Sequence, residues 1–388
     1  MTTLIDVPPG LNGVAVTDTT IGDVLGDEGR YHYRGLDAPT LARQRSFDEV
    51  WHLLAVGHLP DPVERAVFEA GNAAARRLPH SVEAVLEPMA RATGATLGRV
   101  RAALSLAAAD LDLRPLIDLD GTTRAVQART VAAVMPVLVA ALHRASLGLP
   151  PVTPDDDLGH AAAYLQMVTG ERPTAAAARA LEQYLILTID HGFNASTFTA
   201  RVVASTGADL ADVVGAALGA LAGPLHGGAP SRALDALDAI GDPARTEAWV
   251  EAELAAGRRI MGFGHAVYRT RDPRSDLLRE VAVGIGGELI ERAVEVERRI
   301  LATLARHKPD RPLPSNVEYF AGVVMAASGL PRSMFTPTFA VSRTVGWVTH
   351  AVEQAAQAKL IRPSSRYTGP LPPDPSAHPS WVSGGGGR

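Results

Sequence analysis

The segment Leu210–His226, LADVVGAALGALAGPLH, indicates the kind of fold that this chain adopts. Its apolar side chains recur at the spacing that places them on one face of an α-helix, at positions 210, 213, 214, 217, 218 and 221. Gly223 and Pro224 follow as a stop signal. The segment therefore predicts a helix that ends directly before His226. Because helical patterns dominate the chain, the predicted fold class is mostly α.

Two further segments favour helices. Thr153–Asp156, TPDD, offers an N-cap, a proline for the first turn and two acidic residues, which predicts a helix through His160 to Met167. Residues 289–304 carry an apolar face, with Glu and Arg four positions apart beside it. Strand patterns lie near the start of the chain, where residues 13–21 and 31–34 predict a short two-stranded β ribbon.

Glycine-rich and proline-rich connections divide the chain into predicted domains. Residues 1–226 are expected to form the first part of a large helical domain, residues 227–329 a smaller domain, and residues 330–370 the return to the large one. Residues 371–388 are rich in Pro, Gly and Ser, so they form either a disordered tail or an arm on a partner surface.

The composition excludes several classes of protein. The 388 residues include no cysteine, which removes disulfides, thiolate metal sites and cysteine nucleophiles and makes the cytoplasm the expected compartment. The N-terminus has no pattern of a signal or transit peptide, and the apolar run 131–142 is too short to cross a membrane. The net charge of −5 with scattered basic residues argues against nucleic-acid binding.

His226 and His265 are the candidate catalytic groups. Both have glycine neighbours, which let a ligand approach the backbone closely. An imidazole can donate a hydrogen bond to a carbonyl oxygen as negative charge develops there. Arg269, Arg271 and Arg274 follow His265, and guanidinium groups bind carboxylates or phosphates. The pattern suits a polyanionic substrate that bears a carbonyl group.

Other interpretations of these residues are weaker or remain open. Glycine neighbours also mark simple turns, and the GFG at 262–264 is no dinucleotide fingerprint because it lacks a third glycine. No metal site is expected, since the chain has no HExxH motif, no cysteine and widely spaced histidines. Surface or core-capping roles are expected for the histidines at 32, 52, 58, 80, 143, 160, 307 and 378.

Eight segments, in chain order, resemble the motifs of the citrate synthase family. They are GLNGVAVTDTTI from residue 10, YRG at 33–35, DHGFNASTFTARVVAST at 190–206, GPLHGGA at 223–229, GFGHAVYRTRDPR at 262–274, NVEYFAG at 316–322, FAVSRTVGWVTHAVEQ at 339–354 and LIRPSSRYTG at 360–369. The resemblance covers nearly the whole chain.

The resemblance implies a two-domain, almost entirely helical homodimer that condenses an acyl-CoA with oxaloacetate and hydrolyses the resulting thioester without a metal or redox cofactor. His226 matches the donor that stabilises the enolate on the thioester oxygen, and Glu318 stands at the position of the catalytic base. His265 matches the histidine that polarises the ketone of oxaloacetate.

The same resemblance assigns the binding residues. Arg274 and Arg343 line the oxaloacetate pocket, His191 contacts it, and Arg362 reaches it from the partner subunit. Near the phosphates of CoA the expected residues are Arg269 and Arg311, each of which could equally be an exposed charge on a loop.

Three departures from the family pattern bear on the substrate. Glu318 replaces the usual aspartate, and one extra methylene moves its carboxylate by roughly 1 Å. Pro230 and Ser231 replace a frequent Asn-Glu, and Thr188 replaces a frequent histidine. Citrate synthesis from acetyl-CoA is the leading hypothesis. 2-Methylcitrate synthesis from propionyl-CoA, another acyl donor or acceptor, and a weakly catalytic paralogue that binds CoA or a dicarboxylate as a regulatory partner are the alternatives.

Overall fold

The computed structural model describes residues 4–370 apart from 225, 227–229, 266, 269 and 270. Residues 18–360 form one compact unit, and the terminal segments form another. In the described part of the terminal unit, a 3-10 turn spans Pro9–Leu11 and the Arg366 guanidinium lies 2.7 Å from the Asp6 carboxylate. The predicted domain boundaries stay predictions, and the tail at 371–388 lies outside the described residues.

The large unit begins with a small antiparallel sheet of β1 (Gly22–Leu25), β2 (Arg30–Tyr33) and β3 (Leu36–Asp37). Gly22 pairs with Tyr33 and Leu25 with Arg30. The predicted ribbon is present, but the prediction of its first strand at 13–21 is wrong. The hairpin turn closes at once after Leu25, whose carbonyl accepts from the backbone N–H of Glu28, so the strand that pairs with β2 has to be the one directly before the turn.

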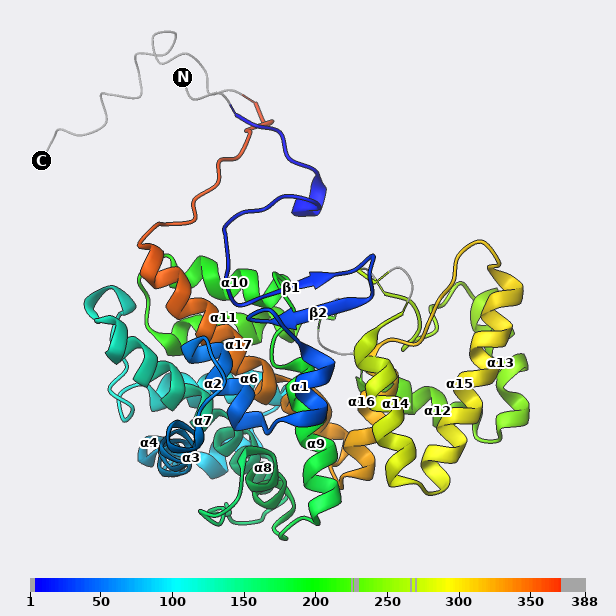
Figure 1. Ribbon diagram of the computed structural model, residues 1–388, viewed down its shortest axis with the longest axis horizontal. Helices are drawn as coiled ribbons and strands as arrows, with labels where there is room; N and C mark the ends of the chain where they lie inside the picture. Colours follow the sequence, from blue (N-terminus) through cyan, green and yellow to red (C-terminus); the bar gives the residue numbers. More distant parts are fainter. Residues whose placement is uncertain (1–3, 225, 227–229, 266, 269–270, 371–388) are drawn as a thin grey trace, which may run out of the picture. The chain divides into compact units, whose positions relative to one another are not determined.

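Helices make up most of the described chain (Figure 1). The first are α1 (Ala38–Gln44), α2 (Phe47–Val56), α3 (Pro62–Ala75), α4 (His80–Glu83), α5 (Leu86–Arg91), α6 (Thr96–Ala107) and α7 (Gly121–Ser146). The next are α8 (His160–Thr169), α9 (Ala175–Thr188), α10 (Ala195–Ala204) and α11 (Leu210–Leu221). The last are α12 (Pro230–Ile240), α13 (Thr246–Ala255), α14 (Pro273–Ile285), α15 (Glu288–His307), α16 (Val317–Ala327) and α17 (Phe335–Gln357).

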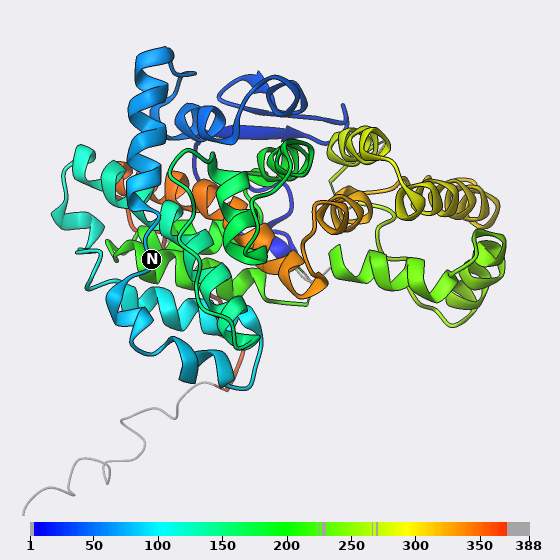
Figure 2. The ribbon, with the colours of Figure 1, turned by 90° about the horizontal axis from the view of Figure 1, so that it is seen from below.

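Within the large unit, α12 to α16 gather on one side, and the sheet and the other helices gather on the opposite side (Figures 1 and 2). The helix α9 packs against α14 and α16 and also against α17. The end of α9 therefore lies where the two groups of helices meet.

The predicted helix at 210–221 is confirmed as α11. The Asp209 side chain accepts from the Asp212 backbone N–H as the N-cap, and the helix ends at Leu221, directly before Gly223 and Pro224. All six residues of the apolar stripe are buried. The helix predicted from Leu289 is also confirmed, as α15.

The helix predicted through His160 to Met167 is confirmed as α8, but its predicted start at Thr153 is wrong. The helix begins at His160, whose backbone N–H donates to the Asp48 carboxylate of α2 at 3.2 Å. Arg172 instead holds the acidic side chains of the preceding loop, Asp155 and Asp157. A carboxylate from another helix thus supplies the cap that the local sequence was expected to provide.

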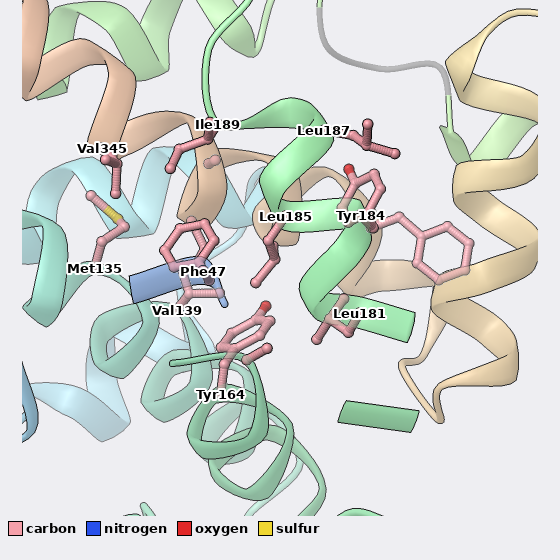
Figure 3. Packing of buried hydrophobic residues seen from close by; sticks show 14 of the residues in the cluster. Phe47, Met135, Val139, Tyr164, Leu181, Tyr184, Leu185, Leu187, Ile189 and Val345 are labelled. Atoms are coloured by element: carbon pink, nitrogen blue, oxygen red, sulfur yellow. The ribbon is translucent and has the colours of Figure 1, made fainter. Parts of the chain in front are cut away.

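The helix α7 lies in the core. Its 26 residues are long and apolar enough to cross a membrane, but 78% of its most apolar window is buried within the fold, as expected for a core helix. It packs against α17, α5 and α8. Figure 3 shows Met135 and Val139 of α7 beside Phe47, Tyr164 and Val345 from other elements.

Two tyrosines of the hairpin hold the carbonyl end of α9. The Tyr33 hydroxyl lies 2.9 Å from the carbonyl oxygen of Ile186 and 3.2 Å from that of Asp190, which share its one proton. The Tyr31 hydroxyl donates to the carbonyl oxygen of Leu187 at 3.1 Å. The last carbonyls of a helix have no partner within it, so these hydroxyls satisfy groups that would otherwise be buried unpaired. The sheet therefore fixes the chain where α9 ends.

Helix α17 approaches the same point closely at Gly346. A β-carbon at this position would lie 2.4 Å from the Ile189 carbonyl oxygen, which is closer than real β-carbons come. The glycine lets α17 pack directly on the end of α9. The side chains of the two helices consequently face a common space.

His160 is a core residue without a hydrogen-bond partner for either ring nitrogen among the described residues. Its ring stacks on Phe47 with a centroid distance of 4.5 Å and meets Trp51 edge-on. Burial lowers the pKa of His160 to about 4, an effect that Asp48 opposes. The imidazole is therefore neutral in the folded protein.

We expect His160→Leu to make the protein less sensitive to acid. The folded pKa lies below the ordinary value of about 6.5, so the unfolded chain binds a proton between these values and stability falls as the pH is lowered through this window. Urea unfolding at pH 7 and pH 5, at one protein concentration, should show this loss to be smaller in the variant by roughly 1–2 kcal/mol. The exposed His80→Gln is the matched control, and an equal loss in all three proteins would contradict the assignment.

Candidate active site

A cavity of about 360 Å³ lies at the end of α9, within the large unit. Its wall combines residues from α9 and the loop after it, from the segment that leads into α14, and from α16 and α17. The lining residues are Tyr184, Thr188, His191, Asn194, His226, Gly264, His265, Val267, Arg274, Asn316, Val317, Glu318, Ala321, Phe339 and Arg343. Six predicted site residues are among them: His191, His226, His265, Arg274, Glu318 and Arg343.

His226 follows α11, as predicted, and its ring is held by Ser196 of α10. Nε2 of His226 lies 2.8 Å from the Ser196 hydroxyl oxygen, which also accepts from the indole N–H of Trp347 at 3.1 Å. Ser196 can donate its single proton either to His226 or to Asn194 Oδ1, which is 2.8 Å away. Donation to His226 leaves the ring proton on Nδ1, where it is available to a ligand.

The imidazole of His265 has a defined tautomer. Its Nδ1 accepts from the backbone N–H groups of Val267 at 2.9 Å and Tyr268 at 3.1 Å, so the ring proton lies on Nε2. This Nε2 is 3.1 Å from the guanidinium of Arg274, which can only donate. Both groups are donors, so a carbonyl or carboxylate oxygen that lies beside them in the cavity can accept from both.

Three histidines of the cavity are neutral at pH 7. Burial lowers the pKa of His226 to about 4, and the charge of Arg343 adds to the effect. Burial and then Arg274 lower the pKa of His265 to about 4. Burial, Arg274 and Arg343 together hold the pKa of His191 well below its usual value. Each ring can therefore donate a hydrogen bond without carrying a charge.

His191 lies beside His265, with ring centroids 6.1 Å apart. Its Nε2 is 3.0 Å from the hydroxyl of Tyr268, and burial raises the pKa of that hydroxyl, so Tyr268 keeps its proton. Tyr268 thereby orients His191 at the cavity wall, a role that the sequence analysis missed.

Arg274 is held by Asp272, two residues before it. The Asp272 carboxylate accepts from Nε and Nη2 of Arg274, both at 2.9 Å, and from the Arg274 backbone N–H at 3.1 Å. It also accepts from the backbone N–H of Val317 at 2.9 Å. Burial alone would raise the pKa of Asp272, but Arg274 and these hydrogen bonds bring it below its usual value, so the pair is ionised.

Arg343 is buried on α17 and faces the same cavity. Its Nε donates to the Thr188 carbonyl oxygen at 2.8 Å, and its guanidinium lies over the Phe339 ring, 4.7 Å from the centroid. The Thr188 hydroxyl donates to the Tyr184 carbonyl oxygen at 2.9 Å and lies 3.1 Å from Ser342. Thr188, one of the departures from the family pattern, thus fixes the chain that positions Arg343.

Glu318 stands in the first turn of α16. Asn316 is the N-cap, and its side-chain oxygen accepts from the Glu318 backbone N–H at 3.0 Å. Asn316 also joins this turn to the segment before His265: its backbone N–H donates to the Gly262 carbonyl and its side-chain amide to the Gly264 carbonyl, both at 2.8 Å. Gly262 has φ of +86° and lies against Tyr319, which explains the glycine there.

The remaining predicted binding residues are Arg269, Arg311 and Arg362. Arg311 is exposed in the loop before α16 and is not part of the cavity lining. Arg362 belongs to the terminal unit, and Arg269 lies outside the described residues. Their assigned roles stay predictions.

Comparison with known proteins finds related sequences that match most of the chain. The family model for citrate synthase, C-terminal domain, matches residues 10–364. A 2-methylcitrate synthase of Mycobacterium tuberculosis is 38% identical over 94% of this chain and 91% of its own length. A citrate synthase of Haloferax volcanii is 36% identical over 93% of this chain and 95% of its own length.

A solved structure is similar along its whole length. The citrate synthase of Thermoplasma acidophilum, in a ternary complex with carboxymethyl coenzyme A and oxaloacetate, has a TM-score of 0.87 to this chain at 27% identity. The match covers 95% of this chain and 98% of that one. The mostly helical fold with a short β ribbon that the sequence predicts is thereby confirmed.

We expect Asp272→Asn to destabilise the protein by about 3–5 kcal/mol, because it leaves the buried Arg274 without its counter-charge. Asp276→Asn is the matched control, since Asp276 lies on the same helix and pairs with the exposed Arg271 at 3.3 Å. Its cost should be below about 1 kcal/mol. Urea unfolding at pH 7 measures both, and similar small losses would show that Asp272 does not hold the site.

Proposed function

The chain belongs to the citrate synthase family, and we propose that it condenses acetyl-CoA with oxaloacetate to give citrate and CoA. It is a condensing enzyme of the transferase class. One observation carries the proposal beyond the family: three neutral histidines, two buried arginines and Glu318 line a single cavity. This set supplies two carbonyl donors, a base and a binding site for a dianion.

Oxaloacetate carries two carboxylates beside a ketone, and the cavity offers groups that suit each part. Arg274 and Arg343 provide two buried positive charges, and guanidinium groups bind carboxylates through paired hydrogen bonds. Nε2 of His265 lies 3.1 Å from the Arg274 guanidinium, so a ligand oxygen that accepts from both groups would be polarised. We assign the ketone to this position and a contact with the substrate to His191.

The acyl-CoA is activated by Glu318 and His226 in this proposal. The Glu318 carboxylate removes a proton from the acyl methyl, and His226 donates a hydrogen bond to the thioester oxygen, on which the enolate charge develops. The enolate carbon then attacks the ketone carbon, and the new alkoxide is stabilised by His265. Water finally adds to the thioester carbonyl, the C–S bond breaks, and CoA leaves as the thiol.

These residues supply the base, the donors and the anion site, so we propose that the reaction uses no metal or redox cofactor. Arg269 and Arg311 are proposed to lie near the phosphates of CoA. The proposed location is the cytoplasm.

The acyl group is the point on which the relatives differ. A 2-methylcitrate synthase and a citrate synthase have nearly the same sequence identity to this chain, 38% and 36%. One methylene in an apolar pocket changes binding by only about 1–3 kcal/mol, so propionyl-CoA is the second candidate substrate. Glu318 has a longer side chain than the usual aspartate, which motivates a third candidate function. In that case the chain is a non-catalytic paralogue that only binds CoA or a dicarboxylate.

The release of free CoA thiol from purified protein decides among these candidates. With oxaloacetate and a concentration series of acetyl-CoA or propionyl-CoA, we expect turnover with both and a higher kcat/KM for acetyl-CoA. The chain has no cysteine, so the thiol assay has no protein background. A higher kcat/KM for propionyl-CoA would assign 2-methylcitrate synthesis, and binding of oxaloacetate without turnover would point to the paralogue.

We further propose a homodimer in which Arg362 completes the partner subunit's cavity. Glu318→Gln and Arg362→Ala should each lower kcat/KM by about 100-fold or more, because an amide cannot accept the proton and the substrate loses one charge partner. Mixed after unfolding and refolding, the two inactive variants should regain roughly a quarter of the wild-type rate, since half of the dimers are mixed and each then has one complete site.

Two controls accompany this experiment. Refolded wild-type protein sets the recoverable rate, and a mixture of Glu288→Gln with the wild type shows that an exposed Glu-to-Gln change has no effect. If Arg362 acted within its own subunit, the mixed dimers would stay inactive.

A further inference from the structure

A cluster of two histidines and a glutamate lies at the corner between α2 and α3 and is not part of the cavity described above. His52 comes from α2, His58 from the connecting loop and Glu64 from the first turn of α3. One ring nitrogen of each histidine and one carboxylate oxygen lie within 4.8 Å of one another. Nε2 of His58 is 3.1 Å and 3.3 Å from the two oxygens of Glu64.

The His52 ring is held in one orientation and one tautomer. Its Nδ1 lies 3.0 Å from the backbone carbonyl oxygen of His58, which can only accept, so the ring proton is on Nδ1. The lone pair is therefore on Nε2. The residue is only 5% exposed, and its ring packs edge-on against Phe68 at a centroid distance of 5.2 Å. Metal-binding histidines are typically oriented by such a hydrogen bond from the other ring nitrogen to a backbone carbonyl.

Glu64 is equally fixed before any ligand binds. Its carboxylate accepts from the Asp61 backbone N–H at 2.9 Å, and the Asp61 side chain accepts from the Glu64 backbone N–H at 2.9 Å, which together form a capping box at the start of α3. The carboxylate is thus held by the local backbone, beside Nε2 of His58.

We propose that His52, His58 and Glu64 bind one divalent transition-metal ion, zinc being the ion that this ligand set suits. Zinc is bound in proteins by imidazole nitrogens and carboxylate oxygens, and three protein ligands leave a fourth position for water. The side chains of His58 and Glu64 are 55% and 40% exposed, so an ion enters directly from solvent.

This proposal departs from the expectation of no metal site, which rested on the wide spacing of the histidines. Each of the three ligands is six residues from the next in the sequence. The turn between α2 and α3 brings them together in space. A bound ion would join the end of α2 to the start of α3. Because the unfolded chain has no preformed site, binding would also stabilise the folded state.

The experiment measures zinc binding by the untagged full-length protein after treatment with EDTA and removal of the chelator. Calorimetric titration with zinc chloride should show one site per chain at this corner. His58→Ala should weaken the Kd of that site by about tenfold or more, since loss of even an outer partner of a ligand costs that much. Glu64→Gln should weaken it too, while its amide oxygen still accepts from Asp61.

The controls separate this site from adventitious binding to other surface histidines. His80→Ala removes an exposed histidine elsewhere and should leave the Kd unchanged. Cobalt in place of zinc should give the absorption of a four-coordinate ion, which His58→Ala should abolish, and the unfolding temperature should rise with zinc in the wild type but not in His58→Ala. Absence of binding to the wild type, or an unchanged Kd in a folded His58→Ala variant, would overturn the proposal.

Discussion

The carboxylate of Asp272 holds the two helix starts on which the cavity depends. It caps α14, pairs with Arg274 and accepts from the backbone N–H of Val317, where α16 begins. A buried carboxylate is tolerated only when donors surround it, so these bonds are obligatory rather than optional. Arg274 and the turn that carries Glu318 consequently keep a fixed separation. Asn316 extends this link to the segment that carries His265.

The electrostatics of the cavity follow from the same arrangement. Burial disfavours a charged imidazole, and the guanidinium groups of Arg274 and Arg343 add to this effect. The pKa values of His191, His226 and His265 are therefore lowered, and the rings are neutral. Negative charge that develops on a ligand oxygen near these rings would be stabilised by their N–H groups, which are already held in place. The site is thus prepared for negative charge before any ligand arrives.

The sequence predicted the elements whose signals are local and missed those that depend on distant partners. The apolar stripe and stop signal of α11 sufficed to place His226. The start of α8 was misplaced because its cap is Asp48, more than 100 residues away along the chain. Ser196, Trp347 and Tyr268 were missed as supports of the histidines, although each lies within a motif of the family resemblance. No periodicity reveals a hydrogen bond between α10 and α17.

Part of the role of Asp272 has a local signal in the sequence. The pair Asp272-Pro273 is a typical start of a helix, with an N-cap followed by proline at the first position. The same reasoning places Asn316 before α16. Neither signal reveals that one carboxylate serves both helices. The roles of Arg362 and Arg269 stay predictions, because one depends on a proposed partner subunit and the other residue lies outside the described part of the chain.

The burial of α7 has a consequence for the newly made chain. Its principal partner, α17, follows roughly 200 residues later in the chain. At about 5–20 residues per second, a ribosome needs about 10–40 s to synthesise this stretch. During that interval this long apolar helix lacks the part of its packing that α17 supplies. We therefore expect nascent chains of this protein to expose a binding site for chaperones. This site becomes covered only after α17 leaves the exit tunnel.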